Sequence, residues 1–131
     1  MKKIIYCFSG TGNSLRAARI IAEALKDATI VNVRYDPSGH SAEDADVIGF
    51  VCPVYEWDVP ERMRKFVSGL SVNPGAYIFM VATYIAVHGK AFETVENILS
   101  SKGAHLSYSR TICSGKIKLD TKGCIVGHCH V

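Results

Sequence analysis

A short glycine-containing loop near the start of this chain lies between an apolar run and an amphipathic segment, and few folds accommodate that order. The run Lys3–Phe8 suits a strand that is buried on both faces of a sheet. The loop Ser9–Ser14 follows it, and Leu15–Lys26 then places apolar residues at helical spacing. A strand, a tight loop and a helix in succession are typical of the opening unit of a parallel sheet.

The rest of the chain repeats this alternation. Four further strands are predicted, over Thr29–Val33, Val47–Cys52, Ala76–Ala82 and Ala104–Thr111. Two further helices are predicted, one beginning at Pro60 and one over Phe92–Lys102. Strands that alternate with helices form parallel units with right-handed crossovers, so we expect an α/β fold with an open, doubly wound sheet of five parallel strands. Ligands of such sheets bind at the carboxyl ends of the strands, where the strand order reverses.

Length and composition limit the possible classes of protein. A chain of 131 residues, 48% hydrophobic and 21% charged, is suited to one packed domain. The net charge of +3 is too small to suggest a nucleic acid or an anionic membrane as partner. The apolar stretch after Lys2 and Lys3 is too short for a signal peptide, and no run approaches the roughly 20 residues of a membrane helix. We therefore expect a soluble cytoplasmic protein.

The five cysteines are predicted to be free thiols. Their number is odd, and Cys7 and Cys52 lie inside predicted core strands, which favours a reducing compartment over a disulfide framework. Cys124, His128, Cys129 and His130 could in principle bind zinc, but their spacing matches no familiar zinc motif. No run of cysteines suits an iron–sulfur cluster. We expect no metal site.

The first loop has the chemistry of a phosphate site. Its two glycines allow a tight turn with exposed N–H groups, and the following helix contributes free N–H groups and the positive end of its dipole. The residues expected to bind are Ser9, Gly10, Thr11, Gly12, Asn13 and Ser14. Many small donors can converge there on a terminal phosphate without any cationic side chain.

Three other phosphate-binding loops fit less well. A dinucleotide loop needs a third glycine where this chain has Leu15. A nucleoside triphosphate loop needs a lysine, and the loop contains none. A small phosphatase would need an arginine six residues after Cys7, where Asn13 stands instead. An ordinary capped turn without a ligand is the remaining alternative.

The string Tyr6–Ser14 (YCFSGTGNS) resembles the opening of flavodoxin-like domains, in particular the flavodoxin part of ferredoxin–flavodoxin fusion proteins. The resemblance continues at Asp46–Phe50 and Cys52–Pro60 and covers about Met1–Arg110. It implies the flavodoxin-like strand order 2-1-3-4-5, and an FMN whose phosphate is held by the first loop. The ferredoxin half of the fusion proteins is absent from this chain.

Two further loops are candidates for the flavin ring. The loop after the third strand contributes Pro53, Val54, Tyr55 and Trp57, of which the two aromatic residues suit the walls of a flat π system. In the resembling families the loop after the fourth strand lines the ring or its ribityl chain, which implies similar roles for Thr83 and Tyr84. No residue stands out as a general acid or base, so no catalytic side chain is assigned.

The end of the chain departs from the flavodoxin pattern. Gly115, Gly123 and Gly127 oppose a long last helix, so that helix is expected to be short or missing. We expect a flavodoxin-like FMN-binding domain over residues 1–112 and an irregular tail over 113–131.

Three functions agree with these features. The first is an FMN-binding protein that transfers electrons between partner proteins or to a small acceptor. The second is an FMN-dependent NAD(P)H:quinone-type reductase, and the third is a flavin-free binding or structural module on the same fold. Turnover with NAD(P)H and a quinone separates the second from the first, and the flavin absorption spectrum separates the third from both.

Overall fold

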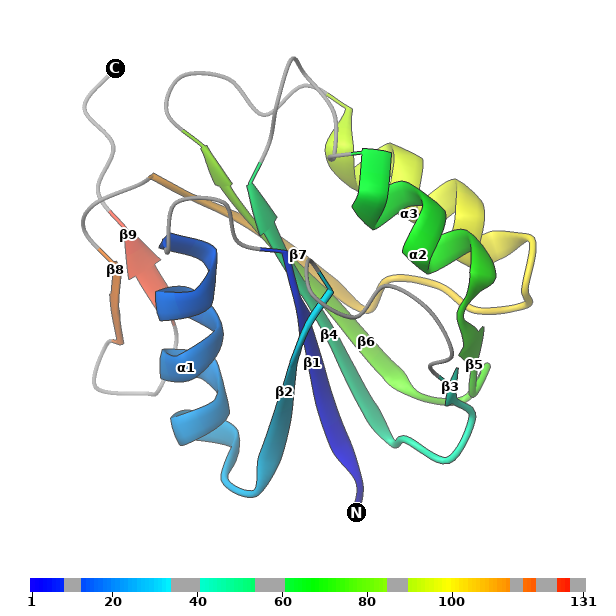
Figure 1. The fold of residues 1–131 in the computed structure, drawn as a ribbon, viewed down its shortest axis with the longest axis horizontal. Coiled ribbons are helices and arrows are strands. Elements are labelled where there is room, and N and C mark those ends of the chain that lie inside the picture. The colour runs from blue at the N-terminus through cyan, green and yellow to red at the C-terminus, as the bar shows by residue number, and fades with distance from the viewer. Residues whose placement is uncertain are drawn as a thin grey trace.

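Five parallel strands form the central sheet of the computed structural model, which describes residues 1–8, 13–33, 41–53, 61–84, 90–113, 117–119 and 125–127 (Figure 1). The strands are β1 (Lys3–Cys7), β2 (Ala28–Asn32), β4 (Val47–Pro53), β6 (Tyr77–Tyr84) and β7 (Tyr108–Cys113). They lie in the order β2-β1-β4-β6-β7. Two short strands, β3 (Ser41–Ala42) and β5 (Ser71–Val72), pair with each other outside this sheet. The predicted order 2-1-3-4-5 is therefore confirmed.

Helices cover both faces of the sheet, as the apolar strands require. Helix α1 (Asn13–Leu25) packs on one face, and α2 (Glu61–Gly69) and α3 (Ala91–Ser100) pack on the other (Figure 1). Successive side chains of β1 alternate between the two cores: Ile5 and Cys7 join the cluster under α1, and Tyr6 joins the cluster on the opposite face. A sheet covered on both sides needs strands that are apolar throughout, which is the pattern that identified them.

Gly49 leaves room for the ring of a neighbouring residue at the centre of the sheet. It pairs with Ile5 of β1 and Phe79 of β6 in the middle of β4. A methyl group added at Gly49 would overlap the ring of Phe79. The missing side chain at position 49 is thus filled by its neighbour, and the face under α1 remains closely packed.

The elements near the C-terminus differ in detail from those predicted. The last strand of the sheet was expected at Ala104–Thr111 but spans Tyr108–Cys113. The reason is a turn after α3, in which Gly103 takes a φ of 79° and the N–H of Ala104 donates to the carbonyl of Leu99 at 3.0 Å. The chain joins β6 only at Ser107, whose N–H donates to Ile78 at 2.6 Å.

The segment expected to be an irregular tail contains a short antiparallel hairpin. Its strands are β8 (Ile117–Leu119) and β9 (Ile125–Gly127), and they lie on the same side of the sheet as α1 (Figure 1). The expectation of irregular structure was wrong for these two stretches. The described residues after β7 are all in strands, in agreement with a short or missing last helix. No helix within the described ranges is long and apolar enough to cross a membrane.

Candidate functional site

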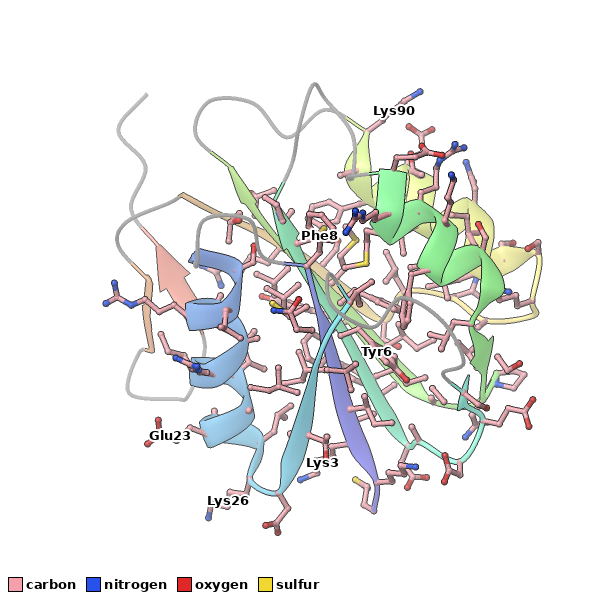
Figure 2. All side chains as sticks on the ribbon, viewed as in Figure 1. Lys3, Tyr6, Phe8, Glu23, Lys26 and Lys90 are labelled. Atoms are coloured by element: carbon pink, nitrogen blue, oxygen red, sulfur yellow. The ribbon has the colours of Figure 1, made fainter. Side chains whose placement is uncertain are left out.

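The carboxyl ends of β1, β4 and β6 meet at one edge of the sheet. Cys7 pairs with Val51, and Pro53 pairs with Thr83. Phe8 continues the hydrogen bonding of β1 through its N–H, which donates to the carbonyl of Val51 at 3.0 Å. Figure 2 shows Phe8 at this end of β1. Since β2 and β4 lie on opposite sides of β1, the strand order reverses here, and this is where open α/β sheets bind ligands.

Helix α1 begins at the same edge. It starts at Asn13, so only residues 9–12 separate it from Phe8. The first N–H groups of a helix have no partner within the helix and carry its positive dipole end. The first turn of α1 contains no acidic residue, whereas the first turns of α2 and α3 contain Glu61 and Glu93. The start of α1 is therefore an environment that favours an anion.

A buried pair of hydroxyl groups joins this helix to the sheet. Oγ of Ser14 lies 3.2 Å from Oγ1 of Thr83, across 69 residues of sequence. Each residue is only 2% exposed, and in the described part of the chain they are the two buried polar residues. A buried hydroxyl without a partner costs about 1–3 kcal/mol, and this contact removes that cost for both groups.

The structure thus brings together two of the predicted binding residues, Ser14 from the first loop and Thr83 from the third. Pro53 lies beside them through its pairing with Thr83, while Asn13 is the first residue of α1 and Tyr84 the last of β6. The other predicted residues, Ser9, Gly10, Thr11, Gly12, Val54, Tyr55 and Trp57, lie outside the described residues.

The sequence places Ser14 and Thr83 in separate loops and does not predict their contact. The available signal was weak, since each is a small hydroxyl residue next to an apolar segment. Their hydrogen bond is thus a property of how α1 packs on β6.

Two other reactive groups near this edge belong to the core. Cys7 and Cys52 are buried thiols that form no disulfide, as predicted. Burial raises the pKa of the Cys7 thiol to about 12, so it is protonated near neutral pH. Tyr6 is stacked on Phe50 with ring centres 6.0 Å apart and lies 4.9 Å from the ring of Phe66, and burial and the charge of Asp44 raise its pKa. These groups act as packing residues and not as ionised catalysts.

The ranges that the structure describes contain no cluster of three or more His, Cys, Asp or Glu able to hold a metal ion. The cysteines and histidines considered for zinc, Cys124, His128, Cys129 and His130, lie outside those ranges.

Comparison with known proteins decides the family. The model of a flavodoxin domain matches residues 4–121, which is most of the chain. This protein belongs to the flavodoxin domain family. The match extends past the boundary expected at residue 112 and includes β8. No curated protein matches this chain.

Solved structures share its fold. Two-electron reduced flavodoxin from Megasphaera elsdenii is 20% identical with a TM-score of 0.66, the match covering 85% of each chain. Oxidised flavodoxin 1 from Bacillus cereus is 16% identical with a TM-score of 0.71, covering 94% of this chain and 89% of its own. An azoreductase from Bacillus anthracis is 11% identical with a TM-score of 0.63, covering 86% of this chain and 87% of its own. At these identities the likeness establishes a common fold.

Proposed function

We propose that this protein binds FMN at the carboxyl edge of its sheet and transfers electrons between redox partners. The observation that carries the proposal is the position of α1, which begins directly after β1 at the point where the strand order reverses. Membership of the flavodoxin domain family supports the same cofactor. Bound FMN would supply the redox chemistry, because its ring accepts and releases electrons.

The described residues at this edge suit the phosphate of FMN. The first turn of α1, whose N–H groups have no partner within the helix, contains no carboxylate, and Ser14 adds a hydroxyl. Hydroxyl and N–H donors can bind a dianion without a basic side chain. In this proposal Ser9, Gly10, Thr11, Gly12 and Asn13 provide the remaining donors.

The ring of FMN would lie over the ends of β4 and β6. Pro53 and Thr83 pair at those ends. We assign the walls of the ring site to Val54, Tyr55 and Trp57, which follow β4, and to Tyr84 at the end of β6. Aromatic and apolar side chains there would exclude water from the ring and fix its orientation.

The partner in this proposal is another redox protein or a small-molecule electron acceptor. A second role, as an FMN-dependent reductase of quinones or similar molecules, is supported by the fold that this chain shares with the azoreductase. A reductase would consume NAD(P)H in the presence of a quinone at a steady rate, whereas a carrier would do so only when a partner reductase is added.

The direct test is the absorption spectrum of the purified protein titrated with FMN. Visible flavin bands that shift on binding, together with altered flavin fluorescence, are the expected result. A protein that leaves both the spectrum and the fluorescence of FMN unchanged at high concentration would contradict the proposal and favour the flavin-free module.

A further inference from the structure

Thr83 stands where the loop expected to line the flavin ring begins, yet its hydroxyl is engaged by the helix of the phosphate loop. Oγ1 of Thr83 is 3.2 Å from Oγ of Ser14. Both residues are 2% exposed, and Thr83 is held between Pro53 of β4 and Ile112 of β7 by the register of the sheet. The backbone of Thr83 is thus fixed by pairing on both sides, so its hydroxyl is held at a defined position opposite Ser14.

We propose that Thr83 is a positioning residue for phosphate binding, which acts through the hydroxyl of Ser14 and not by touching the flavin ring. The proposal rests on the proposed function, since it assigns a role in binding FMN.

The two hydroxyls together hold one proton more than their mutual hydrogen bond uses. Each hydroxyl has one O–H donor and can accept two hydrogen bonds, so the pair holds two protons and uses one of them between its oxygens. When Thr83 donates to Ser14, the proton of Ser14 remains available for another acceptor. A phosphate dianion has only acceptors, so it selects this arrangement.

The polarity of the chain of hydrogen bonds would then run from Thr83 to Ser14 to the phosphate. Donors linked in this way polarise one another, which strengthens the bond to the charged end. The burial of both residues limits the water that competes for the contact between the two hydroxyls. Because Thr83 is the residue before Tyr84, the same contact ties the segment near the ring to the segment that grips the phosphate.

The alternative role for Thr83, direct contact with the ring or ribityl chain, makes a different prediction. FMN and riboflavin have the same ring and ribityl chain, and only FMN carries the phosphate. A lost ring contact would weaken both ligands equally, whereas a lost phosphate-positioning contact would weaken FMN alone.

The test compares FMN and riboflavin affinities by fluorescence titration of the full chain. Thr83→Val keeps the shape of the side chain and removes its hydroxyl, so we expect FMN binding to weaken about tenfold and riboflavin binding to change less than about twofold. Thr83→Ser restores the hydroxyl and should recover most of the FMN affinity. The matched control is Thr111→Val, the same change on β7 at the position paired with Ala82, from which the strand alternation points it to the other face. It should leave both affinities unchanged.

A double-mutant cycle on FMN alone gives a second measurement. Because Thr83 acts through Ser14, the Ser14→Ala and Ser14→Ala/Thr83→Val variants should bind FMN equally weakly. Additive losses, or equal losses for FMN and riboflavin in Thr83→Val, would overturn the positioning role while leaving FMN binding intact. A wild-type protein that binds no FMN would overturn the proposed function and this role together. Urea unfolding of each variant confirms that it is folded before its affinity is used.

Discussion

The ring of Phe79 occupies the space that a side chain at position 49 would fill. The two residues pair across β4 and β6, and Phe79 joins the core cluster on the face of the sheet under α1. Close packing of that face therefore requires a residue without a side chain at position 49.

Gly49→Ala is therefore expected to destabilise the protein by about 1–3 kcal/mol, because the added methyl group forces the Phe79 ring out of its place. The measurement is the free energy of unfolding in urea. Gly69→Ala is the matched control, since a methyl group there meets no atom within 4 Å, and it should leave stability unchanged or raise it slightly. Equal effects of the two substitutions would contradict the packing role of Gly49.

Lys3 caps the end of α1. Its Nζ donates to the carbonyl of Leu25 at 2.5 Å and to that of Lys26 at 3.4 Å, and Figure 2 shows its side chain near this end of the helix. A cation at the C-terminus of a helix satisfies free carbonyls and complements the dipole, and the last turn of α1 has no basic residue of its own. Lys3→Met should lower the unfolding free energy by about 0.5–1.5 kcal/mol.

The neighbouring lysine provides the control for this cap. Lys2 forms an ion pair of 2.8 Å with Asp44, but both side chains are largely exposed. Exposed pairs contribute little, so Lys2→Met should cost less than Lys3→Met in the same urea titration. A larger loss for Lys2→Met would show that the cap is not the stabilising contact.

The buried thiols should resist modification in the folded state. The pKa of Cys7 is raised to about 12 by burial, so almost no thiolate is present near pH 8. We expect iodoacetamide to leave Cys7 and Cys52 unmodified in the native protein and to alkylate both in urea, as read by peptide mass spectrometry. Rapid native labelling of Cys7 would show that the end of β1 opens readily.

Stability in acid should depend on Glu96. Its partial burial acts to raise its pKa, but hydrogen bonds from the N–H of Leu106 at 2.7 Å and from Nδ1 of His105 at 2.7 Å outweigh burial and lower it. A carboxyl whose pKa is lower in the folded state stabilises the fold above its unfolded pKa, and that contribution is lost as the pH falls through the folded value.

The wild-type protein should therefore lose more thermal stability than Glu96→Gln between about pH 6 and about pH 3. The measurement is the difference in Tm between the two pH values. Glu93→Gln is the control, because Glu93 is exposed on the same helix, and it should follow the wild type. An identical acid response of Glu96→Gln and wild type would contradict the assigned hydrogen bonds.

The main strands and helices and their order along the chain could be predicted from the sequence, because local hydrophobic periodicity identifies each element. Apolar runs such as Lys3–Phe8 and Val47–Cys52 mark strands covered on both faces, and the helix after the first loop follows from its amphipathic spacing. The phosphate site predicted after the first strand also rests on consecutive residues, and it stays a prediction.

The contacts that join distant segments could not be read in this way. The hydrogen bond between Ser14 and Thr83 depends on how α1 packs on the sheet. The packing of the Phe79 ring over Gly49 depends on the register of β4 and β6. The late start of β7 depends on the turn after α3. The hairpin of β8 and β9 depends on how the chain after β7 folds back on itself. Local sequence carries little information on such placements, because many alternative partners are similar in size and polarity until packing selects one of them.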